Sequence, residues 1–110
     1  MSPEQATGAG NLVGPTTDVY SLGVILYELL TKKLPFHAAT PAATLEQISH
    51  RDPVNPSKID KHVSRDLETI CSKCLCKQPA NRYTTAGELS EDLSRFLGHQ
   101  SISARRISIV

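Results

Sequence analysis

Three cysteines lie close together in this chain, in a pattern that could hold a metal ion. Cys71, Cys74 and Cys76 form the motif C-x-x-C-x-C. A structural zinc site needs four tetrahedral ligands, usually from two clusters with turns between them. The nearest further ligand, His62, precedes the cluster. Because buried cysteine behaves as a small apolar residue, we predict that these cysteines serve the core and form no metal site, with metal or redox chemistry as the alternative.

The histidines offer no recognisable catalytic arrangement. His37, His50, His62 and His99 show no useful spacing to a nucleophile or a carboxylate. A Ser-His-Asp triad is set by geometry and not by order in the chain, so the spacing alone leaves that alternative open.

Length and charge exclude several classes of protein. The chain has 110 residues, which allows one domain at most. Its net charge is +1 with acids and bases interspersed, so we expect no nucleic-acid partner. Met1 is followed by Ser-Pro-Glu-Gln and by no basic, then apolar, stretch, so we expect no signal peptide. An odd number of cysteines without an export signal suggests reduced thiols and a cytoplasmic location.

The most apolar segment predicts a central helix. Between Tyr20 and Leu30, only Ser21, Gly23 and Glu28 are not large and apolar. A helix that is apolar around nearly its whole circumference should be buried on all sides. It is too short for a membrane segment, which needs about 20 apolar residues. We expect this helix to begin at Thr16 or Thr17, and other helices to surround it.

Three further helices follow from capping signals and apolar periodicity. Thr40 and Pro41 read as an N-cap and a first helical residue for a short helix to about residue 50. Ser64 precedes a helix whose apolar stripe ends near Leu75. Thr85 opens the last helix, with Glu88 completing a capping box. The apolar face of this last helix comprises Leu89, Leu93, Phe96 and Leu97, with Gly98 as its terminator.

Loops separate these helices. Residues 1–15 read as loop, and residues 51–63 as an extended connector. The fold class is therefore all-α, with about four helices and long loops. We predict one domain over residues 1–98 and a flexible tail over residues 99–110.

Four motifs, taken together, resemble a known family. They are Ser2-Pro3-Glu4, the run from Asp18 that reads D-V-Y-S-L-G, Leu34-Pro35-Phe36, and P-x-x-R-Y over residues 79–83. In this order the chain resembles the second half of a eukaryotic-like serine/threonine protein kinase domain, of the bacterial branch. The resemblance covers roughly residues 1–97. It implies part of the helical C-lobe of that fold.

The same resemblance indicates what the chain lacks. The family's glycine-rich loop, ATP-contacting lysine, catalytic-loop aspartate and D-F-G motif all lie upstream of S-P-E. The resemblance therefore implies no catalytic residue and no cofactor-binding residue in this chain, with ATP and magnesium belonging to a longer parent kinase. We expect the fragment to be inactive alone.

Four residues have structural roles that the resemblance implies. In the family, the glutamate at Glu4 pairs with the arginine at Arg82; two unrelated surface charges are the alternative. The family's aspartate at Asp18 holds the catalytic loop, so here we expect it to be solvated or to cap its own helix. Gly23 costs a helix about 1 kcal/mol relative to alanine. Close approach by another element would justify that cost, and a tolerated accident is the alternative.

A docking surface is the last implication. In the family, an apolar residue before S-P-E, here Met1, ends the loop that receives the substrate residue after the phosphoacceptor. The family often docks partners around the helix predicted at residues 41–50, so Pro41, Leu45 and Ile48 are predicted docking residues. The expected partner is a protein substrate.

Two other functions remain open beside the kinase fragment. One is a free-standing helical interaction module derived from a kinase, and the other is a gene remnant without function. Since a partial C-lobe leaves apolar surface uncovered, we also expect marginal stability or self-association.

Overall fold

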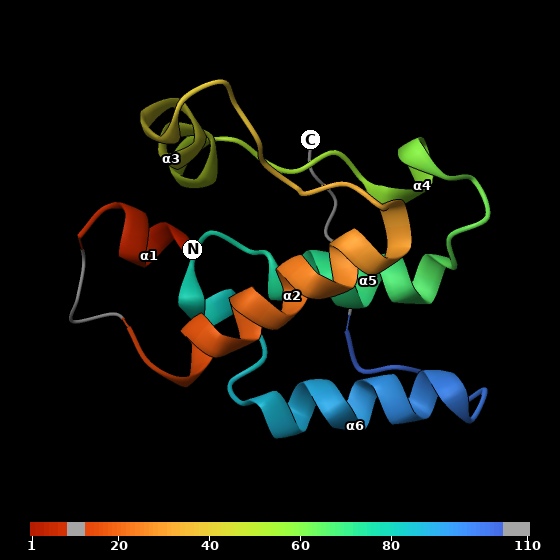
Figure 1. Cartoon of the computed structure of the whole chain (residues 1–110). Helices are drawn as coiled ribbons and strands as arrows, with labels where there is room; N and C mark the ends of the chain where they lie inside the picture. The colour runs from red at the N-terminus through yellow and green to blue at the C-terminus, as the bar shows by residue number, and fades with distance from the viewer. Residues whose placement is uncertain (9–12, 105–110) are drawn as a thin grey trace.

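The computed structural model describes residues 1–8 and 13–104, which form six α-helices and one short 3₁₀ helix without a strand among them (Figure 1). The elements are α1 (Pro3–Ala6), α2 (Pro15–Thr31), α3 (Pro41–His50), α4 (Pro56–Ile59), α5 (Arg65–Cys74), η2 (Pro79–Asn81) and α6 (Ala86–Leu97). The all-α prediction is confirmed. None of the described helices is long and apolar enough to cross a membrane.

The short helices α1 and α4 were not predicted, because they lie in segments that read as loop and connector. Each has four residues and begins with a proline. Four residues cannot show a helical repeat of apolar positions. Pro3 follows Ser2, whose hydroxyl accepts a hydrogen bond from the Gln5 amide. Ser2-Pro3 is thus an N-cap followed by proline at the first helical position, a signal that was present in the sequence.

Helix α2 begins at Pro15, slightly before the predicted cap. The Thr17 hydroxyl accepts a hydrogen bond from the Gly14 amide at 3.1 Å. The same hydroxyl donates to a carboxylate oxygen of Glu4 at 2.7 Å. Thr17 therefore links the start of α2 to α1 and does not act as the N-cap.

The core lies where α2 crosses α5, with α6 packed beneath the pair (Figure 1). Two buried clusters meet there. One comprises Val19, Ile70, Cys74, Tyr83, Leu89 and Ala104, and the other comprises Tyr20, Tyr27, Cys71 and Leu75. Cys71 and Cys74 are fully buried in these clusters, as the core interpretation predicts. Burial raises the pKa of the Cys74 thiol to about 12, so the thiol stays protonated and unreactive at neutral pH.

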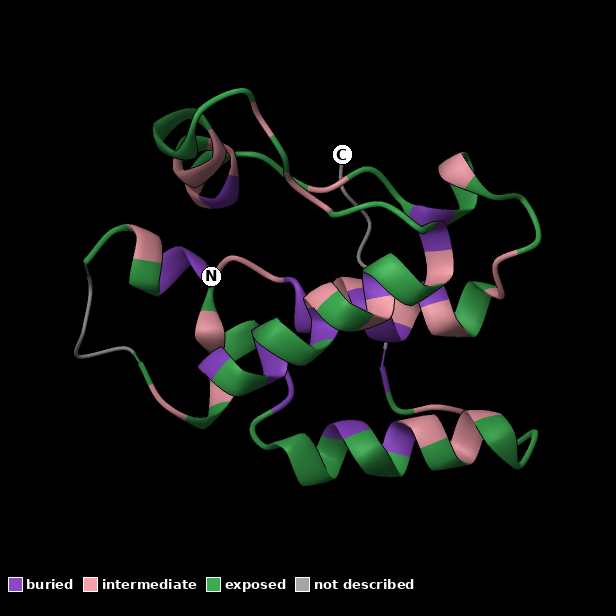
Figure 2. Ribbon diagram, viewed as in Figure 1, coloured by how far each residue is buried: buried purple, intermediate pink, exposed green. Residues whose placement is uncertain are grey.

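The prediction that α2 is buried on all sides is wrong for this chain. Part of α2 is exposed (Figure 2). Three of its exposed residues are large and apolar: Leu22, Ile25 and Leu29. Leu29 is 76% exposed. Among the described residues, α4, α5, η2 and α6 pack on α2, and these three side chains stay exposed despite those contacts. We call Leu22, Ile25 and Leu29 the apolar face of α2.

The end of α6 also differs from the prediction. Leu97 is exposed and does not join the apolar face. Gly98 caps the helix with φ −86°, and His99 is the left-handed residue, with φ 58°. Beyond it, Ile102 and Ala104 pack against the core cluster. The segment predicted as a flexible tail thus contains packed residues up to 104, and residues 105–110 lie outside the described chain.

Gly23 gives a direct test of this packing. A Cβ atom at Gly23 would lie 2.5 Å from the Cβ of Cys74 and 3.2 Å from Leu75 Cδ2. We expect Gly23→Ala to lower the free energy of unfolding by about 1–3 kcal/mol, because the clash outweighs the better helix propensity. Urea unfolding followed by circular dichroism measures this.

The matched control is Gly87→Ala in α6. There the nearest atom to an added Cβ is Thr85 Oγ1 at 3.6 Å, an ordinary contact. This variant should be neutral or slightly stabilising. Equal stability of the two variants would show that α2 and α5 do not approach as described.

Candidate functional site

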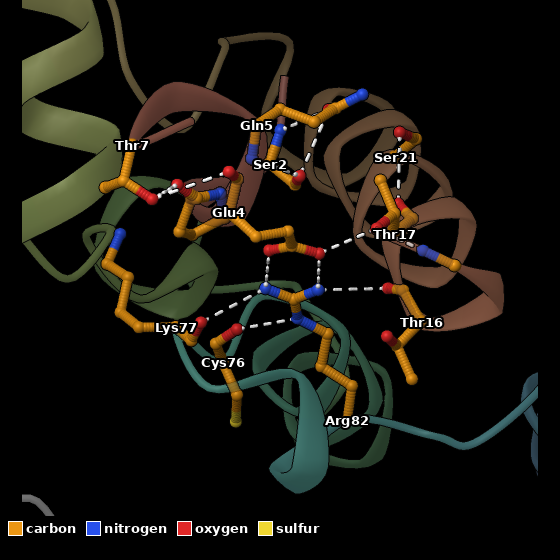
Figure 3. Close-up of polar contacts among 12 residues, drawn as sticks. Ser2, Glu4, Gln5, Thr7, Thr16, Thr17, Ser21, Cys76, Lys77 and Arg82 are labelled. Carbon is orange, nitrogen blue, oxygen red and sulfur yellow. Dashed lines mark hydrogen bonds and ion pairs between the residues drawn. The ribbon is translucent and has the colours of Figure 1, made fainter. Parts of the chain in front are cut away.

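Glu4 and Arg82 form a buried ion pair (Figure 3). Arg82 Nη1 donates to Glu4 Oε2 at 2.8 Å, and Arg82 Nη2 donates to Glu4 Oε1 at 2.8 Å. The two side chains are 2% or less exposed. This is a bidentate pair between residues 78 positions apart. The structure thus brings together the two residues whose pairing the resemblance implies.

The other donors of Arg82 bind three backbone carbonyl groups. Nε donates to the Cys76 carbonyl at 2.8 Å, Nη1 to the Thr16 carbonyl at 3.1 Å, and Nη2 to the Lys77 carbonyl at 3.2 Å (Figure 3). One guanidinium therefore joins α1, the first turn of α2 and the loop after α5. A charge can be buried at low cost in free energy only when its hydrogen-bonding groups all have partners, as the donors of Arg82 do here.

Neighbouring groups hold Glu4 and Arg82 in the orientation that the ion pair needs. Ser2 and Gln5 form a capping box around α1, with Ser2 N donating to Gln5 Oε1 at 2.9 Å. This fixes the short helix so that Glu4, in its first turn, points inward (Figure 3). The Arg82 guanidinium also lies over the ring of Tyr20, 4.9 Å from its centroid. Cation–π attraction adds to the ion pair there.

The pair changes the acidity of Glu4. Burial alone would raise the pKa of this carboxyl group, but hydrogen bonds from Arg82 and Thr17 outweigh it and lower the pKa to about 2. Glu4 is therefore ionised over the whole physiological range.

Asp18 and Gly23, the other two structural residues, do not join this pair. Asp18 lies exposed in the first turn of α2, where a negative charge suits the helix dipole. Gly23 lies buried against α5, and its carbonyl group is 3.6 Å from the Cys71 thiol. The close approach that would justify a helical glycine is present at Gly23.

The four predicted docking residues, Met1, Pro41, Leu45 and Ile48, all line one cavity of about 580 Å³. We call this cavity the α3 groove. Its other walls come from α2, from the segment between α2 and α3, and from α3 itself. They comprise Tyr20, Val24, Leu34, Pro35, Phe36, His37, Ala38, Ala39, Thr40 and Thr44. Sequence reasoning missed the contribution of α2, because it treated Tyr20 and Val24 only as core.

Lys77 connects the α3 groove to the ion pair. Its ammonium group donates to the Ile48 carbonyl at 2.7 Å and lies 4.2 Å from the centroid of the Phe36 ring. Its own carbonyl accepts from Arg82. Burial lowers the pKa of Lys77 to about 8. The position of α3 therefore depends on the same loop that Arg82 holds.

Comparison with known proteins identifies relatives over nearly the whole chain. A family profile described as protein kinase domain matches residues 1–94. The serine/threonine-protein kinase PknB of Mycobacterium leprae is 41% identical over 107 residues, which is 97% of this chain and 17% of the relative. PknB of Mycobacterium tuberculosis strain H37Ra is 44% identical over 95 residues, 86% of this chain and 15% of the relative.

A further relative comes from another genus. A probable serine/threonine-protein kinase of Streptomyces coelicolor is 38% identical over 104 residues, 94% of this chain and 15% of that protein. The chain thus spans 15–17% of the length of these three relatives.

Breaking the ion pair should strongly lower the stability of the folded chain. We expect Glu4→Gln to lower the free energy of unfolding by about 3–5 kcal/mol, because it leaves a buried guanidinium without its counter-charge. Urea unfolding measures the loss. Glu91→Gln is the control, since Glu91 forms an exposed pair with Arg95 at 3.8 Å. That change should cost less than about 1 kcal/mol. Equal costs would contradict the central role of Glu4.

Acid should act through the same carboxylate. The pKa of Glu4 is lower in the folded chain, about 2, than its ordinary value of 4.5. Its ionised form therefore stabilises the fold above pH 4.5, and this contribution is lost as the pH falls from about 4.5 to about 2. We expect the stability difference between the wild type and Glu4→Gln to shrink over that window in urea unfolding at successive pH values. A difference that stays constant down to pH 2 would show that folding does not lower the pKa of Glu4.

Proposed function

Because this chain belongs to the protein kinase domain family and is a serine/threonine kinase fragment, we propose that it supplies a scaffold and a protein-docking surface and transfers no phosphoryl group by itself. The observation that carries the proposal is the α3 groove. The resemblance implies docking at Met1, Pro41, Leu45 and Ile48, and all four line that one cavity.

The chemistry of phosphoryl transfer supports the inactive half of this proposal. Kinases position ATP with a glycine-rich loop and a lysine, bind magnesium through D-F-G and the catalytic loop, and use an aspartate of H-R-D as the base. The printed sequence contains neither a D-F-G motif nor a G-x-G-x-x-G motif. ATP and magnesium are thus cofactors of a longer kinase in this account, and a protein is the proposed partner.

One tripeptide matches the catalytic loop by letters only. His50-Arg51-Asp52 spells H-R-D. The family motif continues with leucine and then asparagine four positions later, whereas this chain has Pro53 and Ser57. It also follows S-P-E, whereas the catalytic loop precedes it. The tripeptide spans the end of α3 and the connector, with all three residues exposed. We assign it no catalytic role.

A second function is favoured by one observation. The α3 groove is built mostly from one continuous stretch, residues 34–48, together with Met1 and two residues of α2. This supports a free-standing helical interaction module. Both functions use the same groove, and they differ in whether the chain works alone.

Nucleotide binding tests the inactive scaffold directly. We expect isothermal titration of the chain with MgATP to give no binding heat, and radiolabelled ATP to label neither the chain nor a serine/threonine peptide. The kinase domain of Mycobacterium tuberculosis PknB serves as the positive control. Stoichiometric MgATP binding by this chain would overturn the proposal.

Exposed apolar surface should make the chain self-associate. The apolar face of α2 is uncovered, and such patches mediate association. We expect concentration-dependent association in sedimentation velocity, and Leu29→Lys should reduce it. Leu97→Lys is the matched control, because Leu97 on α6 is equally exposed, at 76%. Association that Leu97→Lys reduces as much as Leu29→Lys would show that α2 is not the contact.

A further inference from the structure

Asp92 on α6 is a buried carboxylate that neither the ion pair nor the α3 groove uses. It is 0% exposed and accepts four hydrogen bonds. Two come from side chains: Tyr83 Oη at 2.6 Å and Arg95 Nη1 at 2.9 Å. The other two come from the backbone amides of Ser103 and Ala104, at 2.7 and 3.0 Å.

The two backbone hydrogen bonds bind consecutive residues of the segment after α6. Ser103 N donates to Oδ1 of Asp92, and Ala104 N donates to Oδ2. A carboxylate that binds adjacent amides fixes the path of the backbone whatever the side chains are. Because the acceptor is charged and buried, these hydrogen bonds are stronger than neutral ones at the surface.

Apolar contacts also hold the segment after α6 against the core. Ala104 is 4% exposed and belongs to the cluster that contains Val19 of α2 and Ile70 of α5. Ile102 packs against that cluster from its edge, as Leu93 and Phe96 of α6 do. The segment thus fills a position in the core between three helices.

Asp92 is itself held in place by side chains on its own helix and just before it. Tyr83 precedes α6, and Arg95 lies one turn after Asp92 on the same helix. Burial alone would raise the pKa of Asp92, but the hydrogen bonds from Tyr83, Ser103, Ala104 and Arg95 hold the pKa well below its usual range. If the segment left, an ionised carboxylate would lose two of its four donors.

We infer that residues 102–104 form a latch that closes the core, with Asp92 as its anchor. The folded unit then extends past α6, and past residue 94, where the family match ends. The site under the latch is a binding site for an extended segment with apolar, polar and apolar residues in turn, and Ile102-Ser103-Ala104 occupies it. The inference is independent of the proposed function, because it uses none of the α3 groove.

Amide hydrogen exchange in the full chain, followed by NMR, tests the latch. In the wild type, the amides of Ser103 and Ala104 should exchange at least about tenfold more slowly than unstructured peptide amides. In Asp92→Asn, which keeps the shape and removes the charge, their protection should fall by about tenfold or more, while amides in the middle of α6 stay protected. Glu91→Gln removes the neighbouring exposed charge and should leave both amides protected.

A second variant covers the case in which Asp92→Asn fails to fold. Ser103→Pro removes one amide donor without changing α6. It should release the Ala104 amide to fast exchange while α6 amides remain slow. Fast exchange of Ser103 and Ala104 in the wild type would overturn the inference. So would wild-type protection of Ala104 in either variant.

Discussion

The ion pair between Glu4 and Arg82 is the constraint on which the rest of this structure depends. Removing two charges from water costs several kcal/mol each, and only a full set of hydrogen bonds repays it. Here the set is complete: a bidentate pair, Thr17 on the carboxylate, and three carbonyl groups on the guanidinium. Those partners come from three separate segments, namely α1, the first turn of α2 and the loop after α5, so the fold must bring all three together or leave a charge unpaired.

That requirement explains how the loops are held in the described part of the chain, which has neither a sheet nor a disulfide. Arg82 fixes the loop after α5, and Lys77 in that loop binds the last turn of α3. The geometry of the α3 groove therefore follows from a charge pair that does not line it. A groove built from short segments gains its rigidity in this way, from polar contacts that allow few alternatives.

The helix α2 has two different sides. One side buries Val19, Tyr20, Gly23 and Tyr27 against α5 and α6. The other side carries the apolar face of α2 to solvent. Apolar residues around the whole helix therefore predicted the buried side correctly and the exposed side wrongly.

The sequence predicted the elements better than the contacts between them. The long helices followed from caps and apolar periodicity, which are local signals. The pairing of Glu4 with Arg82 came only from the family resemblance, because nothing local relates residues 78 positions apart. Gly23 could be recognised as costly, but its neighbour Cys74 could not be named. The Asp92 anchor was missed entirely, since an aspartate on an amphipathic helix reads as surface until the segment that covers it is placed.

A double-mutant cycle on Glu4 and Arg82, read by urea unfolding, tests the central claim most directly. The account predicts that Glu4→Gln with Arg82→Met is markedly less destabilised than the sum of the two single variants, with a coupling of about 2–3 kcal/mol, because the double variant leaves no unpaired buried charge. Additive effects, within about 0.5 kcal/mol, would mean that the two residues act separately. The fold would then have to be held together by something other than this pair.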